Sequence, residues 1–180
     1  MTADSTHVHS NFFENKYPYP ERITALSDQD AKWMEKRYKG LKFVQGDGCC
    51  LPFKNNSFDL VFSSAVLEHV GDRERQKQFL AECVRVSSRY VFLTTPNRWY
   101  PFEFHSALPF VHWLPQKYFF MILRLLGKKS LADRNVLNLC SSSDIVRFLT
   151  SCHVNNFKIY YSYFMGFPAN IIVFIDKQQS

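Results

Sequence analysis

Glycine is scarce in this sequence and absent from its first part. The chain has six glycines among 180 residues, and none of them precedes Gly40. It therefore contains no GxGxxG turn, the glycine-rich loop that binds the pyrophosphate of a dinucleotide. This absence counts against a nicotinamide-dependent dehydrogenase.

Paired cysteines and an N-terminal apolar segment are also missing. None of the five cysteines belongs to a CxxC motif or to a metal-ligand spacing, and their number is odd. No apolar run stands near the N-terminus, where a secretory signal would carry one. We therefore predict reduced thiols, a cytoplasmic location and no metal site.

Apolar residues are plentiful enough for a substantial core. Hydrophobic residues make up 46% of the chain and charged residues 21%, which predicts a single globular domain over residues 1–180. The net charge of +6 comes from scattered lysines and arginines rather than from a basic block, so we expect no nucleic-acid partner. No pattern in the sequence indicates an oligomeric state.

The apolar pattern alternates between short strands and amphipathic helices, which predicts an α/β fold with a mostly parallel sheet and helices on both faces. Two final strands are joined by a link too short for a crossover, so they form a C-terminal antiparallel hairpin. The expected strands cover residues 22–26, 41–45, 58–62, 89–93, 157–164 and 170–176, and the expected helices cover residues 29–38, 72–86 and 141–151.

Several residues mark where these elements begin and end. Ser27 or Asp28 is expected to cap the helix over 29–38, and Ser141 with Asp144 forms an S-x-x-D capping signal for the helix over 141–151. The strand over 58–62 is almost entirely apolar and is expected to be buried. The buried face of the helix over 72–86 is expected to carry Gln76, Phe79, Leu80, Cys83 and Val84.

Polar residues follow two of the expected strands at their carboxyl ends, where open α/β sheets bind ligands. Asp47 and Gly48 come after the strand over 41–45, and Ser64 comes after the strand over 58–62. The carboxylate of Asp47 accepts hydrogen bonds, and Gly48 lets the backbone approach a flat ligand closely.

The order of these pieces resembles the class I S-adenosylmethionine-dependent methyltransferases, in the branch often labelled methyltransferase type 11. The resemblance runs from about Ile23 to Asn97. In that family an acid like Asp47 meets the adenine, a Ser-Phe-Asp like 57–59 opens the fourth strand, and a Leu-Glu-His like 67–69 follows it.

The resemblance implies a Rossmann-like fold, S-adenosylmethionine as cofactor, and cofactor-binding residues at the strand ends. These are Ser27, Asp28, Asp47, Gly48, Cys49 and Ser64. The family has a carboxylate at the end of its second strand, whereas Ser27 stands in register here and Asp28 follows. Either this strand ends one residue later than its pattern predicts, or Ser27 performs a weaker version of the same task.

Methyl transfer to a small acceptor is the activity that the resemblance implies. A general base helps if the acceptor is a hydroxyl, and His69 and His105 are the candidates; each also has a structural interpretation, His69 at a helix start and His105 in a covering loop. The alternative function is a non-catalytic or degenerate methyltransferase-like binding domain.

The segment 98–140 interrupts the alternating pattern with many aromatic residues and is predicted to be a lid-like insertion. Pro115 and Gly127 mark the start and end of a helix within it. Three interpretations stay open: a lid over the substrate, peripheral membrane contact through 115–129, or additional core. The aromatic content favours an apolar or lipid-like acceptor, although a sugar can stack on the same rings. The basic residues that flank the apolar run, Lys117, Arg124, Lys128 and Lys129, suit membrane contact.

The resemblance also implies a first strand and a glycine-rich turn that the sequence does not show. Residues 1–10 are polar and contain neither. We therefore expect an N-terminally incomplete domain, either truncated or degenerate, that folds poorly or binds its cofactor weakly, because the missing strand would lie in the middle of the sheet.

Overall fold

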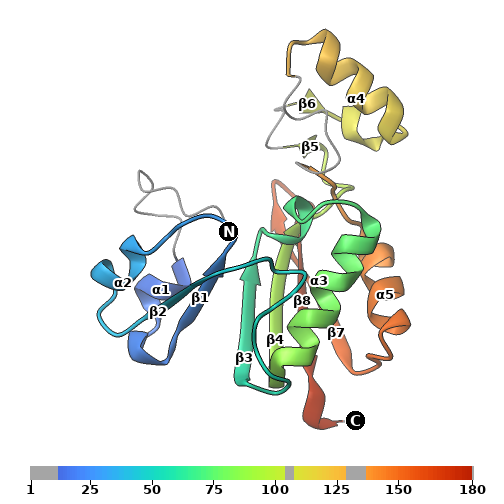
Figure 1. Ribbon diagram of the computed structural model, residues 1–180. Helices are drawn as coiled ribbons and strands as arrows, with labels where there is room; N and C mark the ends of the chain where they lie inside the picture. Colours follow the sequence, from blue (N-terminus) through green and yellow to red (C-terminus); the bar gives the residue numbers. More distant parts are fainter. Residues whose placement is uncertain (1–11, 104–107, 129–136, 180) are drawn as a thin grey trace. The chain divides into compact units, whose positions relative to one another are not determined.

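The computed structural model describes residues 12–103, 108–128 and 137–179. The chain divides into two compact units, Met1–Pro52 and Phe53–Ser180 (Figure 1).

The first unit is a pair of parallel strands with short helices. Strands β1 (Thr24–Ser27) and β2 (Lys42–Gln45) pair in parallel, with Ser27 opposite Gln45. Its helical segments are α1 (Phe12–Lys16), the 3-10 turn η1 (Pro20–Arg22) and α2 (Trp33–Arg37). The buried side chains that hold the unit together are Ile23, Ala31, Met34, Tyr38 and Leu41.

The helix expected over 29–38 is shorter than the sequence indicates, and the predicted cap is wrong. Helix α2 begins after Lys32, whose side chain makes no capping hydrogen bond. The hydroxyl of Ser27 instead accepts the N–H of Gln29 at 3.1 Å, and Asp30 accepts the N–H of Lys32 at 3.0 Å. These local bonds hold turns ahead of the helix and compete with helical hydrogen bonds.

Strand β1 ends at Ser27, one residue later than its sequence pattern predicts. This is the first of the two alternatives given for the strand. The N–H of Gly46 donates to the carbonyl of Ser27 at 2.9 Å, which carries the ladder through that residue. Asp28 therefore directly follows the strand.

The second unit contains a four-stranded mixed sheet in the order β3-β4-β8-β7. Strands β3 (Phe58–Ser64) and β4 (Ser87–Pro96) run in parallel, and β8 (Phe167–Asp176) runs antiparallel both to β4 and to β7 (Phe157–Phe164). This arrangement confirms the α/β class and the C-terminal hairpin. The turn of the hairpin is shorter than expected and consists of Met165 and Gly166.

Strands β4 and β8 carry the core of this unit. Alternate residues along them are buried, among them Leu93 and Val173. Helix α3 (Arg73–Val86) buries four of the five predicted residues, but Val84 is half-buried and Val86 takes its place. Helix α5 (Ser142–Ser151) adds two buried residues, Ile145 and Leu149.

Strand β3 is less buried than its apolar sequence predicts. It lies at one edge of the four-stranded sheet, and the side chain of Leu60 is 41% exposed. The interpretation of residues 58–62 as a buried strand is therefore wrong for this part of the strand. A run of apolar residues indicates that a strand forms, whereas its burial depends on which elements cover each face of the sheet.

The segment between β4 and α5 forms a small structure of its own. It contains strands β5 (Phe102–Glu103) and β6 (Leu108–Pro109), the 3-10 turn η3 (Val111–Trp113) and helix α4 (Gln116–Leu125). Pro115 precedes the first residue of α4, and Gly127 follows its end with φ of +75°, as the sequence predicts.

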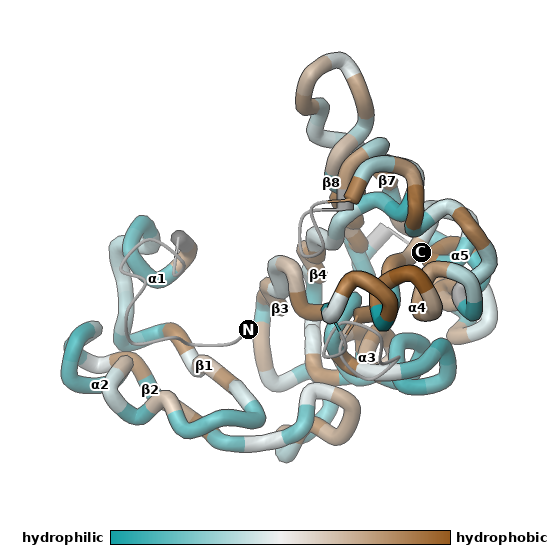
Figure 2. The backbone as a smooth tube through the Cα atoms, turned by 90° about the horizontal axis from the view of Figure 1, so that it is seen from above, coloured by the Kyte–Doolittle hydropathy of each residue, from teal (hydrophilic) through white to brown (hydrophobic). Residues whose placement is uncertain are grey.

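Figure 2 shows α4 as a strongly hydrophobic stretch. Among the described residues, no helix is long and apolar enough to cross a membrane.

We expect Leu93→Ala to destabilise the protein by about 2–5 kcal/mol, because it leaves a cavity in the centre of the sheet. The side chain of Leu93 is 0% exposed, whereas that of Leu60 on the edge strand is 41% exposed. Leu60→Ala is the matched control and should cost clearly less. Urea unfolding followed by circular dichroism measures both, and equal losses would contradict the assignment of β4 as the core strand.

Candidate functional site

The first group of predicted site residues lies at the carboxyl ends of β1 and β2. Ser27 is buried at the end of β1, and the exposed Asp28 follows it. The side-chain amide of Gln45, the last residue of β2, donates to the carbonyl of Asp28 at 3.0 Å. This bond links the two strand ends, so the segments that follow β1 and β2 lie together at one edge of the pair.

Asp47 begins a tight turn just after β2. One carboxylate oxygen of Asp47 accepts the N–H of Cys49 at 2.9 Å, and its carbonyl accepts the N–H of Cys50 at 3.0 Å. The Asp47 side chain is exposed, Gly48 is half-buried and Cys49 is buried. The turn therefore orients a carboxylate that faces water at the end of β2.

Sequence reasoning missed Gln45 as part of this edge. The sequence does contain a signal for Gln45, because it is a polar residue at the last position of β2. That position is paired with Ser27 at the end of β1. The amide of Gln45 provides both donor and acceptor groups.

The second group lies at the carboxyl end of β3. The hydroxyls of Ser64 and Thr94 hydrogen-bond across the parallel pair at 2.9 Å. Ser63 Oγ is buried and has no hydrogen-bond partner within the described residues. Ala65 turns the chain with φ of +53°, and its N–H donates to the carbonyl of Thr94 at 2.9 Å. The exit from β3 is thus a strained turn lined with hydroxyl groups.

Glu68 belongs to the Leu-Glu-His motif of residues 67–69. Hydrophobic periodicity does not mark it, so the sequence alone does not identify it as a site residue. It lies in the 3-10 turn η2 (Leu67–His69), and it is fully buried. Thr95 donates its hydroxyl to Glu68 Oε2 at 2.9 Å, and His69 Nε2 lies 3.9 Å from Glu68 Oε1. A buried carboxylate requires such partners, so Glu68 fixes η2 against the end of β4.

His69, one of the two candidate bases, is exposed on this turn. The contact with the carboxylate of Glu68 limits the positions of its ring. The other candidate, His105, lies outside the described residues.

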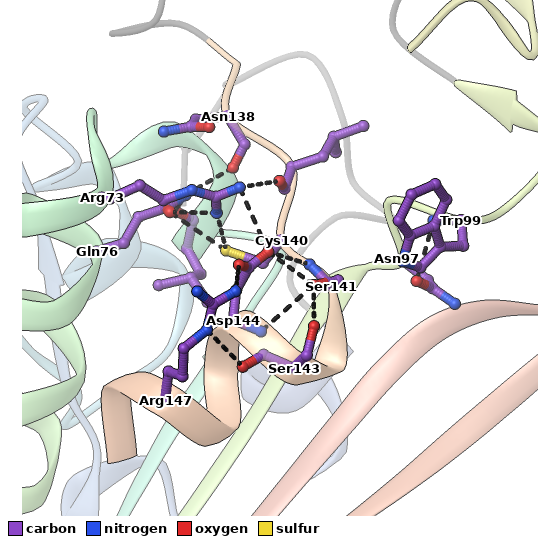
Figure 3. A network of polar contacts seen from close by, with 12 residues as sticks. Arg73, Gln76, Asn97, Trp99, Asn138, Cys140, Ser141, Ser143, Asp144 and Arg147 are labelled. Carbon is purple, nitrogen blue, oxygen red and sulfur yellow. Dashed lines mark hydrogen bonds and ion pairs between the residues drawn. The ribbon is translucent and has the colours of Figure 1, made fainter. Parts of the chain in front are cut away.

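A polar network ties α3 to the chain leading into α5 (Figure 3). Arg73 donates to Gln76 Oε1 at 2.9 Å, to Cys140 Sγ at 3.0 Å and to the carbonyl of Leu139 at 3.1 Å. The amide of Gln76 donates to the carbonyls of Leu67 and Asn138. This network holds η2, α3 and residues 138–140 in one arrangement.

Cys140 is a structural thiol in this network rather than a nucleophile. Burial raises its pKa to about 12, although the charge of Arg73 acts in the opposite direction. A cysteine with such a pKa stays protonated at neutral pH, and the thiol is the unreactive form.

Asp144 anchors the other end of the network. Burial acts to raise its pKa, but the N–H and hydroxyl of Ser141 together with Arg73 and Arg147 hold the pKa below its ordinary value of 3.8. Asp144 also accepts from the N–H of Ser141 at 3.0 Å, which completes the capping box that the sequence predicts.

The structure thus brings the predicted cofactor-binding residues together in two groups, each within its own unit. Ser27, Asp28 and Asp47–Cys49 share the edge of the β1-β2 pair, and Ser64 lies at the end of β3. Within the described residues, no cluster of side chains could hold a metal ion, and all five cysteines are free thiols.

Comparison with known proteins adds a family match. Residues 16–90 match a family model described as a methyltransferase domain. The chain is 32% identical over 122 residues to norajmaline N-methyltransferase of Rauvolfia serpentina, a match that covers 66% of this chain and 36% of that protein. The chain therefore spans about a third of the length of this curated relative.

Solved structures with the same fold are more distant in sequence. A S-adenosylmethionine-dependent methyltransferase of Methanosarcina mazei has a TM-score of 0.56 at 16% identity, with 86% of this chain and 81% of that chain covered. The 1,6-didemethyltoxoflavin-N1-methyltransferase of Burkholderia thailandensis, solved with S-adenosylhomocysteine, has a TM-score of 0.57 at 12% identity, with 87% and 61% covered. Both likenesses show the fold.

We expect Asp144→Asn to lower the free energy of unfolding at pH 7 by about 1–3 kcal/mol, because it weakens hydrogen bonds to a charged group. A carboxylate whose folded pKa is depressed stabilises the fold above its unfolded pKa and loses that contribution as the pH falls. The difference from the unmodified protein should therefore shrink as the pH drops below 3.8.

Urea unfolding at pH 7 and pH 3 measures this difference. Asp59→Asn, which alters an exposed carboxylate on β3, is the control and should change little. A gap between Asp144→Asn and the unmodified protein that stays constant down to pH 3 would contradict the role of the ionised carboxylate.

Proposed function

We propose that this chain is a class I S-adenosylmethionine-dependent methyltransferase that transfers a methyl group from S-adenosylmethionine to a small, hydrophobic acceptor. The observation that carries the proposal is the pair of exposed carboxylates, Asp28 and Asp47, which follow two adjacent parallel strands whose ends Gln45 links.

The chemistry of this edge fits the adenosine part of the cofactor. Ribose hydroxyls and the adenine amino group are hydrogen-bond donors, and carboxylates at strand ends accept from such donors. Asp28 and Ser27 would accept from the ribose, and Asp47 would accept from the adenine. Gly48 and the buried Cys49 would form the backbone surface next to the ring.

Ser64, at the end of β3 in the second unit, is a further cofactor-binding residue that the family resemblance implies. Its hydroxyl already bonds to that of Thr94, and either oxygen can be the donor. The neighbouring Ser63 hydroxyl is buried without a hydrogen-bond partner within the described residues, which suits a polar ligand at this strand end.

Catalysis by these residues consists mainly of positioning. When bound, the cofactor supplies a methyl group that its sulfonium activates for displacement. The protein has to align the acceptor with that group and exclude water. His69 would accept a proton from the acceptor, and its Nε2 lies 3.9 Å from Oε1 of the buried Glu68.

The acceptor is proposed from the aromatic segment and from the names of similar proteins. Exposed rings of Trp99, Phe110 and Trp113 lie near one another in the segment 98–140, and we propose that this lid-like insertion covers a hydrophobic acceptor. Two similar proteins are named N-methyltransferases, which favours a nitrogen acceptor.

The five free thiols suit the reducing cytoplasm, where we place the protein.

Asp47→Asn should weaken the binding of S-adenosylhomocysteine by roughly 10–100-fold, because a neutral amide replaces a charged acceptor. The amide oxygen can still accept the N–H of Cys49, so the turn is kept. Isothermal titration calorimetry of the whole chain measures the change.

Asp30→Asn is the matched control. Asp30 is also exposed, lies in the same unit and accepts the N–H of the residue two positions on, at 3.0 Å. It should leave the affinity unchanged. Equal losses in the two variants would contradict the role of Asp47, and a folded chain that shows no binding at all would favour the non-catalytic alternative.

A further inference from the structure

Helix α4 has apolar side chains on two faces, and among the described residues only one of these faces is buried. Phe119, Phe120 and Leu123 are buried and pack with Leu108 and Val111. On the other face, Tyr118, Met121 and Leu125 recur at helical spacing and are 44%, 51% and 79% exposed. We call these three side chains the outer face of α4.

The residues that flank α4 extend its exposed apolar surface. Trp113 and Leu114 lead into the helix and are 39% and 41% exposed, and Leu126 after it is 54% exposed. The ring of Trp113 meets that of Phe110 edge-on, with centroids 4.9 Å apart. A set of exposed large apolar side chains on this scale marks an interaction surface.

The charged residues on and next to α4 in the sequence are all basic. Lys117 and Arg124 are exposed on α4 itself, and Lys128 follows the helix. The sequence from residue 104 to residue 132 contains no aspartate or glutamate. A helix that combines exposed apolar side chains with basic charges complements a surface that is anionic outside and apolar beneath.

We propose that the outer face of α4 binds the surface of an anionic phospholipid bilayer. Apolar side chains enter the boundary between headgroups and acyl chains, and the basic side chains contact lipid phosphates. Tryptophan and tyrosine favour this boundary because their rings are apolar and carry a polar group.

The length of α4 and its charge count against two other uses of this surface. The ten residues of α4 extend about 15 Å, half of a hydrocarbon core, so the helix lies along the bilayer. A second copy of the chain docked face to face would place Lys117 and Arg124 near the same cations, and like charges oppose such a contact.

The first test uses the whole chain and vesicles of phosphatidylcholine with or without phosphatidylserine. The protein should co-sediment with the anionic vesicles, and the fluorescence of Trp99 and Trp113 should shift to shorter wavelength. Leu125→Glu should lower partitioning roughly tenfold or more, because it puts a charge into the apolar boundary. Met165→Glu alters a side chain that is 77% exposed, close to the 79% of Leu125, and should bind normally.

The second test reverses charges. The double change Lys117→Glu and Arg124→Glu should lower partitioning by at least roughly 25-fold, since each basic residue near an anionic surface strengthens binding about fivefold and the new carboxylates are repelled as well. Lys36→Glu with Lys39→Glu gives the same net charge from exposed residues of the other unit and should have a much smaller effect.

Several results would overturn the proposal. They are absence of binding to anionic vesicles, equal binding to vesicles without phosphatidylserine, or equal losses in each variant and its control. Concentration-dependent dimerisation that Leu125→Glu abolishes, without vesicle binding, would assign the surface to a second copy. None of these measurements depends on the cofactor, so they stand apart from the test of methyl transfer.

Discussion

Strand β4 is hydrogen-bonded on both sides, and the second unit depends on this position. It pairs in parallel with β3 and antiparallel with β8, and its residues Val91 and Leu93 are fully buried. A strand in this place must satisfy its backbone through both neighbours and its side chains through helices on the sheet. This requirement places β4 inside the sheet, between β3 and β8, rather than at an edge.

The carboxyl end of β4 also determines where the polar groups of the second unit meet. Thr95 donates to the buried Glu68, and Asn97 forms a parallel bridge with Cys140, which bonds to Arg73 and Gln76. Buried polar groups are stable only when they are satisfied together. The turn η2 with His69 is therefore positioned by residues that lie far from it in the sequence.

The two faces of α4 lie in different environments. The inner face packs into the small core of the segment 98–140, as the core interpretation expects. The outer face leaves Met121 and Leu125 in water, and no structural need of the unit explains these apolar side chains. A lipid surface supplies the apolar environment that these two side chains lack.

By itself, the sequence determined the elements whose signals are local. Hydrophobic periodicity located strands β2, β3 and β7 and helix α3, Ser141 and Asp144 located the start of α5, and strand-end polarity pointed to Asp47 and Ser64. Only the tertiary structure decided the end of β1, the short α2, the exposure of Leu60 and the burial of Glu68. These depend on partners remote in the chain, such as Gly46 for Ser27 and Thr95 for Glu68, and no local pattern encodes which of them will meet.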